Sequence, residues 1–176
     1  APSFMIGVNM DASDVGLYGR ADQVIRMPLK LVTPLVNVAV PSLNAARQAG
    51  EQLEPHLVRV QSSIGFAFAA ILIPIAAASP TLFPFLLGSQ WEAAAPVSRA
   101  LALGGVATAL SQVNYWAFLL MGRSRDLLKY NLVVKPITVL CTVAGSFVSL
   151  FATALAISVA ACISWLIGVV WLARHA

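Results

Sequence analysis

Three charged side chains open an apolar segment at a spacing that places them on one helix face. Asp22, Arg26 and Lys30 stand four residues apart, and residues 31–46 beyond them carry no charge. A helix turns about 100° per residue, so this spacing aligns the three side chains. A charge at the centre of a bilayer costs about 2.5–3.5 kcal/mol on insertion scales, and such residues usually face a cavity or a partner. The stripe is therefore the first candidate for a functional surface.

The stripe suits the binding of an anion. Thr33 and Asn37 fall on the same arc, about 80° wide. A guanidinium such as that of Arg26 binds phosphate with two donors, and Lys30 adds a point charge about 13 Å along the helix. Asp22 can pair with Arg26 at i,i+4. The structural alternative is an ion pair plus a lysine that snorkels to the interface and anchors the helix.

Two further polar stripes occur in later apolar segments. The first contains Lys135, which lies near one end of its segment, so snorkelling is again the structural alternative. The second includes Gln112, with Asn114 to its side, and such residues commonly bond neighbouring helices. The other members of the two stripes are Asn131, Thr138 and Thr142, and Thr108, Ser111 and Tyr115.

Signatures of enzymes and of metal sites are absent from the sequence. It holds no G-x-S-x-G, H-E-x-x-H or P-loop motif, and its apolar segments hold no paired carboxylates on one face. His56 and His175 are too far apart in sequence to suggest a metal site. We therefore expect no cofactor and no metal, and charged stripes without catalytic groups favour moving a substrate over transforming it.

Composition predicts an all-α integral membrane protein. Of 176 residues, 59% are hydrophobic and only 10% are charged, against about 25% in soluble domains. Long charge-free runs can cross a bilayer, and the runs lack the alternation of a barrel strand. The net charge of +4 is spread over segment ends, which argues against nucleic acid as a partner. Cys141 and Cys162 fall inside apolar segments and are expected to be packing residues.

The apolar runs predict a bundle of five complete transmembrane helices after an N-terminal helix stub at residues 2–10. A loop at residues 11–19, a polar loop at 44–56 and a basic loop at 122–129 separate some of them, and residues 80–96 are too short to span and suggest an interfacial helix. The chain begins inside an apolar segment without Met, so we expect part of a larger protein. The predicted spans are residues 20–43, 57–79, 97–121, 129–150 and 152–173.

The distribution of Lys and Arg predicts the orientation. Six basic residues fall on one side of the predicted bundle and two on the other, which places the C-terminus in the cytoplasm. The six are Arg47, Arg59, Arg123, Arg125, Lys129 and Arg174, and the two are Arg20 and Arg99.

Several short motifs resemble a known transporter family. The stretch VGLYGRADQVIRMP, followed by VNVAVPSLN, resembles the family pattern G-x-Y-x-x-A, Pro, V-x-x-P-x-L. LFPFLLGSQW and MGRSRDLLKYN resemble its LLG-x-x-W segment and its Gly-Arg loop. The family is the polysaccharide-transporter branch (Wzx-like flippases) of the multidrug/oligosaccharidyl-lipid/polysaccharide exporter superfamily. The matching residues of the first pattern are Gly16, Tyr18, Ala21, Pro28, Val38, Pro41 and Leu43.

The resemblance implies a flippase of the bacterial inner membrane that exports undecaprenyl-diphosphate-linked glycans, such as O-antigen or exopolysaccharide precursors, by alternating access. Such transporters have two six-helix lobes around a cavity, and this chain resembles the C-terminal lobe, with the N-terminal lobe absent or supplied by a partner chain. We then expect Arg26 and Lys30 to meet the diphosphate or acidic sugars. The other expected substrate-binding residues are Thr33, Asn37, Gln112, Asn114 and Lys135. Asp22 would orient Arg26 or take part in ion coupling.

Three alternatives remain open at the level of sequence. One is an ion-coupled exporter of drugs or lipid precursors from the same superfamily. Another is a membrane-embedded glycan polymerase or ligase, which would be expected to carry a large extracytoplasmic loop. The third is a non-transporting fragment that binds a partner chain.

Overall fold

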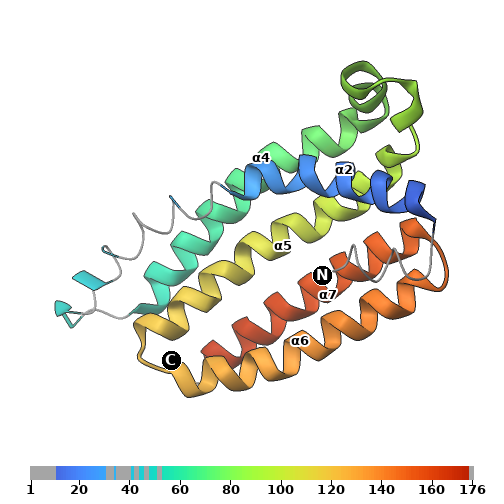
Figure 1. The fold of residues 1–176 in the computed structure, drawn as a ribbon. Helices are drawn as coiled ribbons and strands as arrows, with labels where there is room; N and C mark the ends of the chain where they lie inside the picture. Colours follow the sequence, from blue (N-terminus) through green and yellow to red (C-terminus); the bar gives the residue numbers. More distant parts are fainter. Residues whose placement is uncertain are drawn as a thin grey trace.

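The structure is a computed structural model that describes residues 11–30, 34, 41, 44–45, 48–50 and 53–174. All regular structure among these residues is helical, which confirms the predicted all-α class (Figure 1). The helices are α2 (Ala12–Leu29), α4 (Leu53–Leu87), α5 (Ala94–Leu120), α6 (Ser124–Ser146) and α7 (Leu150–Ala173), with the short 3-10 helix η1 at Ser89–Trp91.

Three of the described helices are long and apolar enough to cross a membrane. They are Pro55–Leu87 within α4, and the whole of α6 and α7. Helix α5 has 27 residues, which gives a length of about 40 Å, but it carries more small and polar side chains. With several such helices the chain is a multi-pass membrane protein. The first predicted span continues beyond α2 into residues that lie outside the described ones.

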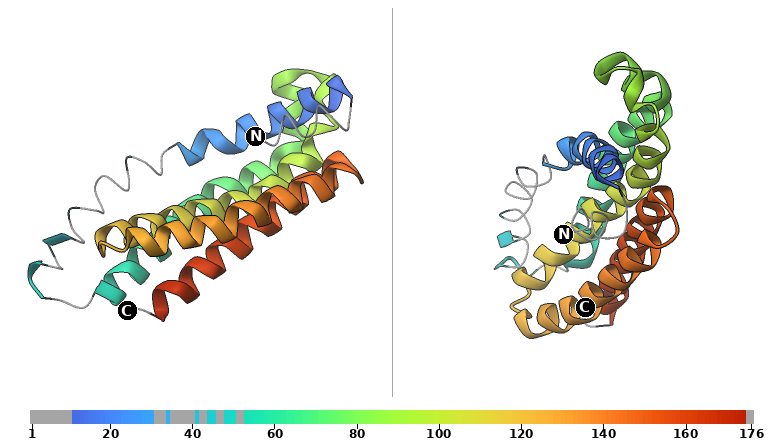
Figure 2. Two further views of the ribbon diagram at one scale, coloured as in Figure 1. Left: turned by 60° about the horizontal axis from the view of Figure 1, so that its bottom comes forward. Right: turned by 45° about the vertical axis from the view of Figure 1, so that its right-hand side comes forward.

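Helix α5 lies at the centre of the bundle. It packs against α2, α4 and α7, and α6 packs mainly on α7. Viewed from the side, α4, α5, α7 and α6 follow one another in a curved row, and α2 lies on the inner side of the curve (Figure 2). The inner side of this row is therefore covered by α2 at one edge and bordered by α6 at the other.

Two apolar clusters hold the helices together. The larger one joins α2, α4 and α5 through buried Tyr18, Ile25, Phe68 and Leu72. The smaller one packs Phe118 against α6 and α7. Burial of each large apolar side chain stabilises a water-soluble fold by about 1.5–3 kcal/mol. In lipid, however, close packing of small residues matters more, and α5 and α7 are rich in Ala, Gly and Ser.

The two ends of the bundle each gather several connections. At one end Arg20 lies over the Trp91 ring, with 5.5 Å from its Cζ atom to the ring centroid, so the start of α2 stands beside η1. The α6–α7 turn lies at this same end, at the right in Figure 1. The α5–α6 turn and the C-terminal end of α7 lie at the other. The helices thus alternate in direction, as the orientation argument requires.

Two predicted loops are largely helical in the structure, one near the N-terminus and one in the middle of the chain. Residues 11–19, predicted as a loop, are helical from Ala12 because the packing of Tyr18 into the core outweighs the poor helix propensity of two glycines. The predicted basic loop at 122–129 is only a short turn, because Gly122 adopts a φ of +70° and α6 begins at Ser124. The predicted span from 129 therefore starts five residues too late.

The structure also corrects the predicted break at residues 80–96. Helix α4 continues as far as Leu87, so the suggested interfacial helix is part of it. Pro80 has no N–H to bond the Ala76 carbonyl, which is the usual reason for a helix to break. Here the Ser79 hydroxyl donates to that carbonyl at 2.8 Å, and Arg99 Nε of α5 donates to it at 3.2 Å. Because the neighbouring groups satisfy the carbonyl, the helix passes the proline.

Candidate functional site

The charged stripe of α2 forms the ion pair that its spacing predicted. Arg26 Nε donates to Asp22 Oδ2 at 2.6 Å. Arg26 is 58% exposed and Asp22 24% exposed, so the guanidinium keeps donors that face outward. Lys30 follows at the C-terminal end of α2 and is exposed. Thr33 and Asn37 lie outside the described residues, and their place in the stripe stays a prediction.

The second half of α5 presents polar side chains on the inner side of the row. Gly105 lies against Ile25 and Leu29, so α2 covers α5 up to this level. Gln112 is exposed and lies seven residues farther along, about 10 Å beyond the covered part. Tyr115 is partly exposed on the same arc. Gln112 is therefore open to a ligand that approaches between α2 and α6.

Lys135 lies on α6 beside the second half of α5. The rings of Phe118 and Tyr130 are 5.8 Å apart, which fixes the register of the antiparallel pair. Lys135 is exposed and lies five residues beyond Tyr130, about 7.5 Å toward the centre of the bundle. Lys30 follows Leu29, whose side chain lies beside Gly105 of α5. The two lysines thus come from opposite edges and are offset by about 10 Å along the bundle, with Lys30 near the level of residue 106 of α5 and Lys135 near the level of residue 113.

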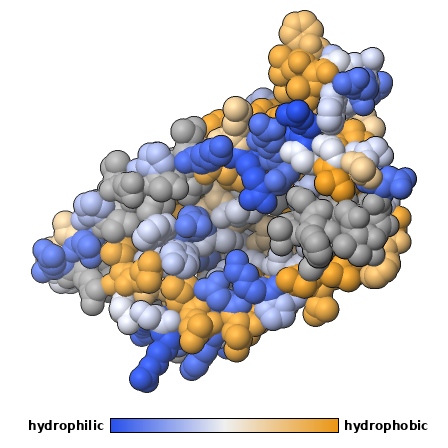
Figure 3. Space-filling view, in the orientation of Figure 1, coloured by the Kyte–Doolittle hydropathy of each residue, from blue (hydrophilic) through white to orange (hydrophobic). Residues whose placement is uncertain are grey.

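We refer to Arg26, Lys30, Gln112, Tyr115 and Lys135 as the polar face. Figure 3 shows hydrophilic side chains over α2 and a second hydrophilic group lower on the same side of the molecule, with apolar side chains beside and below the second group. The three cations of this face can attract an anionic ligand, and the Gln112 amide can bond the hydroxyl groups of that ligand. The polar face therefore suits an anion that carries hydroxyl groups.

Asn114 lies apart from the polar face. Its side chain is 0% exposed. Because Asn114 lies two residues after Gln112, the two side chains point about 160° apart around the helix. Gln61 Nε2 of α4 donates to Asn114 Oδ1 at 2.5 Å, and Asn114 Nδ2 donates to the Trp165 carbonyl of α7 at 3.2 Å. Asn114 therefore joins three helices, the role that its residue type commonly has in membrane bundles.

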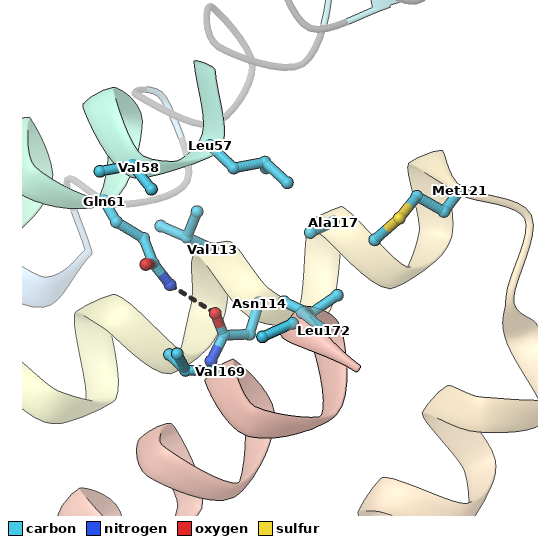
Figure 4. Close-up of a pocket in the computed structure, with 10 residues that line it drawn as sticks. Leu57, Val58, Gln61, Val113, Asn114, Ala117, Met121, Val169 and Leu172 are labelled. Atoms are coloured by element: carbon cyan, nitrogen blue, oxygen red, sulfur yellow. Dashed lines mark hydrogen bonds between the residues drawn. The ribbon is translucent and has the colours of Figure 1, made fainter. Parts of the chain in front are cut away.

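A pocket of about 120 Å³ adjoins this amide pair. Figure 4 shows Gln61 and Asn114 facing each other beside the pocket, with apolar side chains of α4, α5 and α7 around them. Its other lining residues include Leu57, Val113, Ala117, Met121, Val169 and Leu172. Gln61 was not singled out from the sequence, although an amide inside a long uncharged run is a signal for such a bond.

No group of three potential metal ligands occurs among the residues that the structure describes. The one ion pair that the described residues show beside the polar face joins Asp22 to Arg26. The chemistry available on this face is accordingly ionic attraction and hydrogen bonding.

Comparison with known proteins places the chain in a family. Residues 1–96 match the family described as "Polysaccharide biosynthesis protein", and this match includes α2 and α4. It covers 96 of the 176 residues. The chain belongs to this family. The membership confirms the resemblance to polysaccharide transporters that the motifs around Tyr18 and Pro28 indicated.

Two curated relatives extend the similarity. The amylovoran biosynthesis protein AmsL of Erwinia amylovora is 29% identical over 148 residues, which cover 80% of this chain and 36% of AmsL. The teichuronic acid biosynthesis protein TuaB of Bacillus subtilis (strain 168) is 24% identical over 121 residues, which cover 68% of this chain and 25% of TuaB. The aligned part is thus about a third and a quarter of these relatives. No solved structure matches the chain.

Proposed function

We propose that this polysaccharide biosynthesis protein forms one lobe of a membrane transporter that exports lipid-linked oligosaccharide or polysaccharide precursors. The second lobe would come from the same polypeptide or from a partner chain. The proposal excludes covalent change of the substrate, so the protein is a carrier and not an enzyme. The family and its relatives, one from amylovoran and one from teichuronic acid biosynthesis, support a polymer precursor as the substrate.

The main support for the proposal is that three cations, Arg26, Lys30 and Lys135, lie on helices of an otherwise apolar bundle. Cations at membrane depth are retained where they face a cavity or a ligand. All three are exposed in the isolated bundle, and Gln112 lies open between α2 and α6. A diphosphate-linked glycan offers both a compact anion and many hydroxyl groups, and this face offers groups for both.

The proposed mechanism is alternating access between two lobes. The polar face would line the cavity, and the two lobes would rock so that the cavity opens to each side in turn. Asp22 holds Arg26 in one orientation through their ion pair while no anion is bound. We propose that the protein spans the bacterial inner membrane, as its resemblance to polysaccharide transporters implies. We propose that its C-terminus is in the cytoplasm, as the distribution of Lys and Arg predicts.

The experiment that tests the proposal removes the two cations of α2. In cells that depend on this transporter for surface polysaccharide, the double variant R26Q/K30Q in the full-length protein should lose export while its membrane insertion stays normal. The matched control is R125Q/K129Q, which removes two exposed cations of α6 near the α5–α6 turn, away from the polar face. Normal export by R26Q/K30Q would refute the proposed cavity.

A further inference from the structure

Tyr18 is the least satisfied polar residue of α2. Its side chain is 1% exposed and packs in the larger apolar cluster. Its hydroxyl is buried and makes no hydrogen bond of ordinary length and angle with any residue that the structure describes. A buried hydroxyl without a partner costs free energy, and Phe would fill the same space without that cost. Within the part of the chain that the structure describes, no ordinary hydrogen bond therefore explains why this position carries a hydroxyl group.

The position of Tyr18 in the stripe supplies such a reason. Tyr18, Asp22 and Arg26 follow one another at intervals of four residues, so they share one face of α2. The Arg26 guanidinium lies near enough to act on the hydroxyl oxygen as a weak donor, and the Asp22 charge also acts on the hydroxyl. What has no acceptor is the O–H group itself. Asp22 accepts from Arg26 at 2.6 Å, and its carboxylate lies one helical turn beyond Tyr18. Asp22 thus has a donor one helical turn away on each side. Arg26 already donates to it, and the Tyr18 O–H group does not.

We propose that Tyr18 is a positioning residue that takes over Asp22 when Arg26 moves to an anionic ligand. Arg26 is the more exposed member of the ion pair, so its guanidinium can swing toward the polar face. That movement would leave a partly buried carboxylate without its partner, which is costly in an apolar setting. The Tyr18 hydroxyl then donates to the Asp22 carboxylate, and no proton is transferred. The exchange lowers the cost of releasing Arg26 and so strengthens anion binding.

This inference rests on the proposed function, because it requires Arg26 to bind the anion. The probe is inorganic pyrophosphate, titrated calorimetrically into the purified chain in lipid nanodiscs. A hydrogen bond to a charged group is worth about 10- to 100-fold in affinity, so Y18F should bind pyrophosphate weaker by roughly that factor. Its melting temperature without pyrophosphate should be unchanged or higher, since the unpartnered hydroxyl is gone.

Two variants make the test specific to the exchange. In the D22N background the carboxylate that would accept from Tyr18 is absent. Adding Y18F to this background should therefore change the affinity for pyrophosphate by less than about twofold. Y130F is the matched control, because the Tyr130 hydroxyl is also buried but donates to the Ser164 carbonyl at 2.9 Å, away from Asp22. It should lower the melting temperature and leave pyrophosphate binding intact. An infrared difference spectrum should show a tyrosine C–O band that shifts with pyrophosphate and is missing in Y18F.

The outcomes separate this inference from the proposed function. Equal pyrophosphate affinity in wild type and R26Q would overturn the anion-binding role of Arg26, and with it the exchange. Loss of binding in R26Q with wild-type affinity in Y18F would overturn the role of Tyr18 alone. A Y18F effect that persists in full in the D22N background would show that the hydroxyl acts elsewhere.

Discussion

Gly104 of α5 faces the backbone of Ser158 on α7 with no room for a side chain between them. A Cβ atom on Gly104 would stand 2.6 Å from the Ser158 Cα atom. The Ser158 hydroxyl donates across the same contact to the Ala100 carbonyl at 2.6 Å. Small residues and an interhelical hydrogen bond together hold α5 and α7 as one unit, as expected for helices that associate in lipid.

The first prediction concerns this contact. Gly104→Ala should destabilise the chain by about 1–3 kcal/mol, because the helix backbones must separate to admit the methyl group. The measurement is reversible unfolding in mixed micelles. Gly16→Ala is the control, since nothing lies within 4 Å of a Cβ atom there, and it should be neutral or stabilising. Equal stability of the two variants would contradict the close packing of α5 on α7.

The second prediction concerns the carbonyl that Pro80 leaves unpaired. Arg99→Gln should cost about 0.5–1.5 kcal/mol, because its Nε donates to the Ala76 carbonyl at 3.2 Å. Pro80→Ala restores the backbone N–H, so Arg99→Gln should cost much less in that background. A double-mutant cycle on unfolding free energies measures this coupling. Additive effects would show that Arg99 supports the helix in another way.

The third prediction concerns the amide pair between α4 and α5. Asn114→Ala should cost about 1–2 kcal/mol, because it removes the bonds to Gln61 and to the Trp165 carbonyl and leaves a small cavity. Gln61→Ala should cost less, and the two changes should be less than additive. Gln112→Ala is the matched control, since its side chain is exposed on the polar face, and its effect should fall on export alone.

The fourth prediction concerns the start of α7. The Ser149 hydroxyl accepts from the Ala152 backbone N–H at 3.0 Å, which makes Ser149 the N-cap of this helix. Ser149→Ala should lower the unfolding free energy by about 0.5–2 kcal/mol, and Ser149→Asp should retain most of the stability because its carboxylate can accept the same bond. A loss of stability in Ser149→Asp equal to that in Ser149→Ala would argue against the capping role.

The fifth prediction concerns orientation. In a C141A/C162A background, Ser89→Cys should react with a membrane-impermeant maleimide in intact cells, because η1 is expected outside the cytoplasm. Ser124→Cys should react only after the membrane is opened, since the α5–α6 turn is expected inside. Both positions are exposed at opposite ends of the bundle. The reverse labelling pattern would invert the predicted topology.

Local sequence patterns are enough to predict the class of the fold and the pairing within α2. Charge-free runs of sufficient length dictate membrane helices, since backbone groups must be bonded within a segment in lipid. A spacing of four residues dictates that Asp22 and Arg26 share a face, and the observed 2.6 Å bond follows from that local geometry. The motifs around Tyr18 and Pro28 likewise indicated the family, because they are local patterns.

Which polar side chains are exposed and which bridge helices depends on how the helices pack. Gln112 and Asn114 have similar chemistry and lie two residues apart, yet one is exposed and the other bridges three helices. The continuation of α4 past Pro80 depends on Arg99, which lies 19 residues later and supplies a donor from another helix. The unpartnered hydroxyl of Tyr18 was equally beyond sequence patterns. Each of these outcomes depends on contacts between segments distant in sequence, which local spacing does not encode.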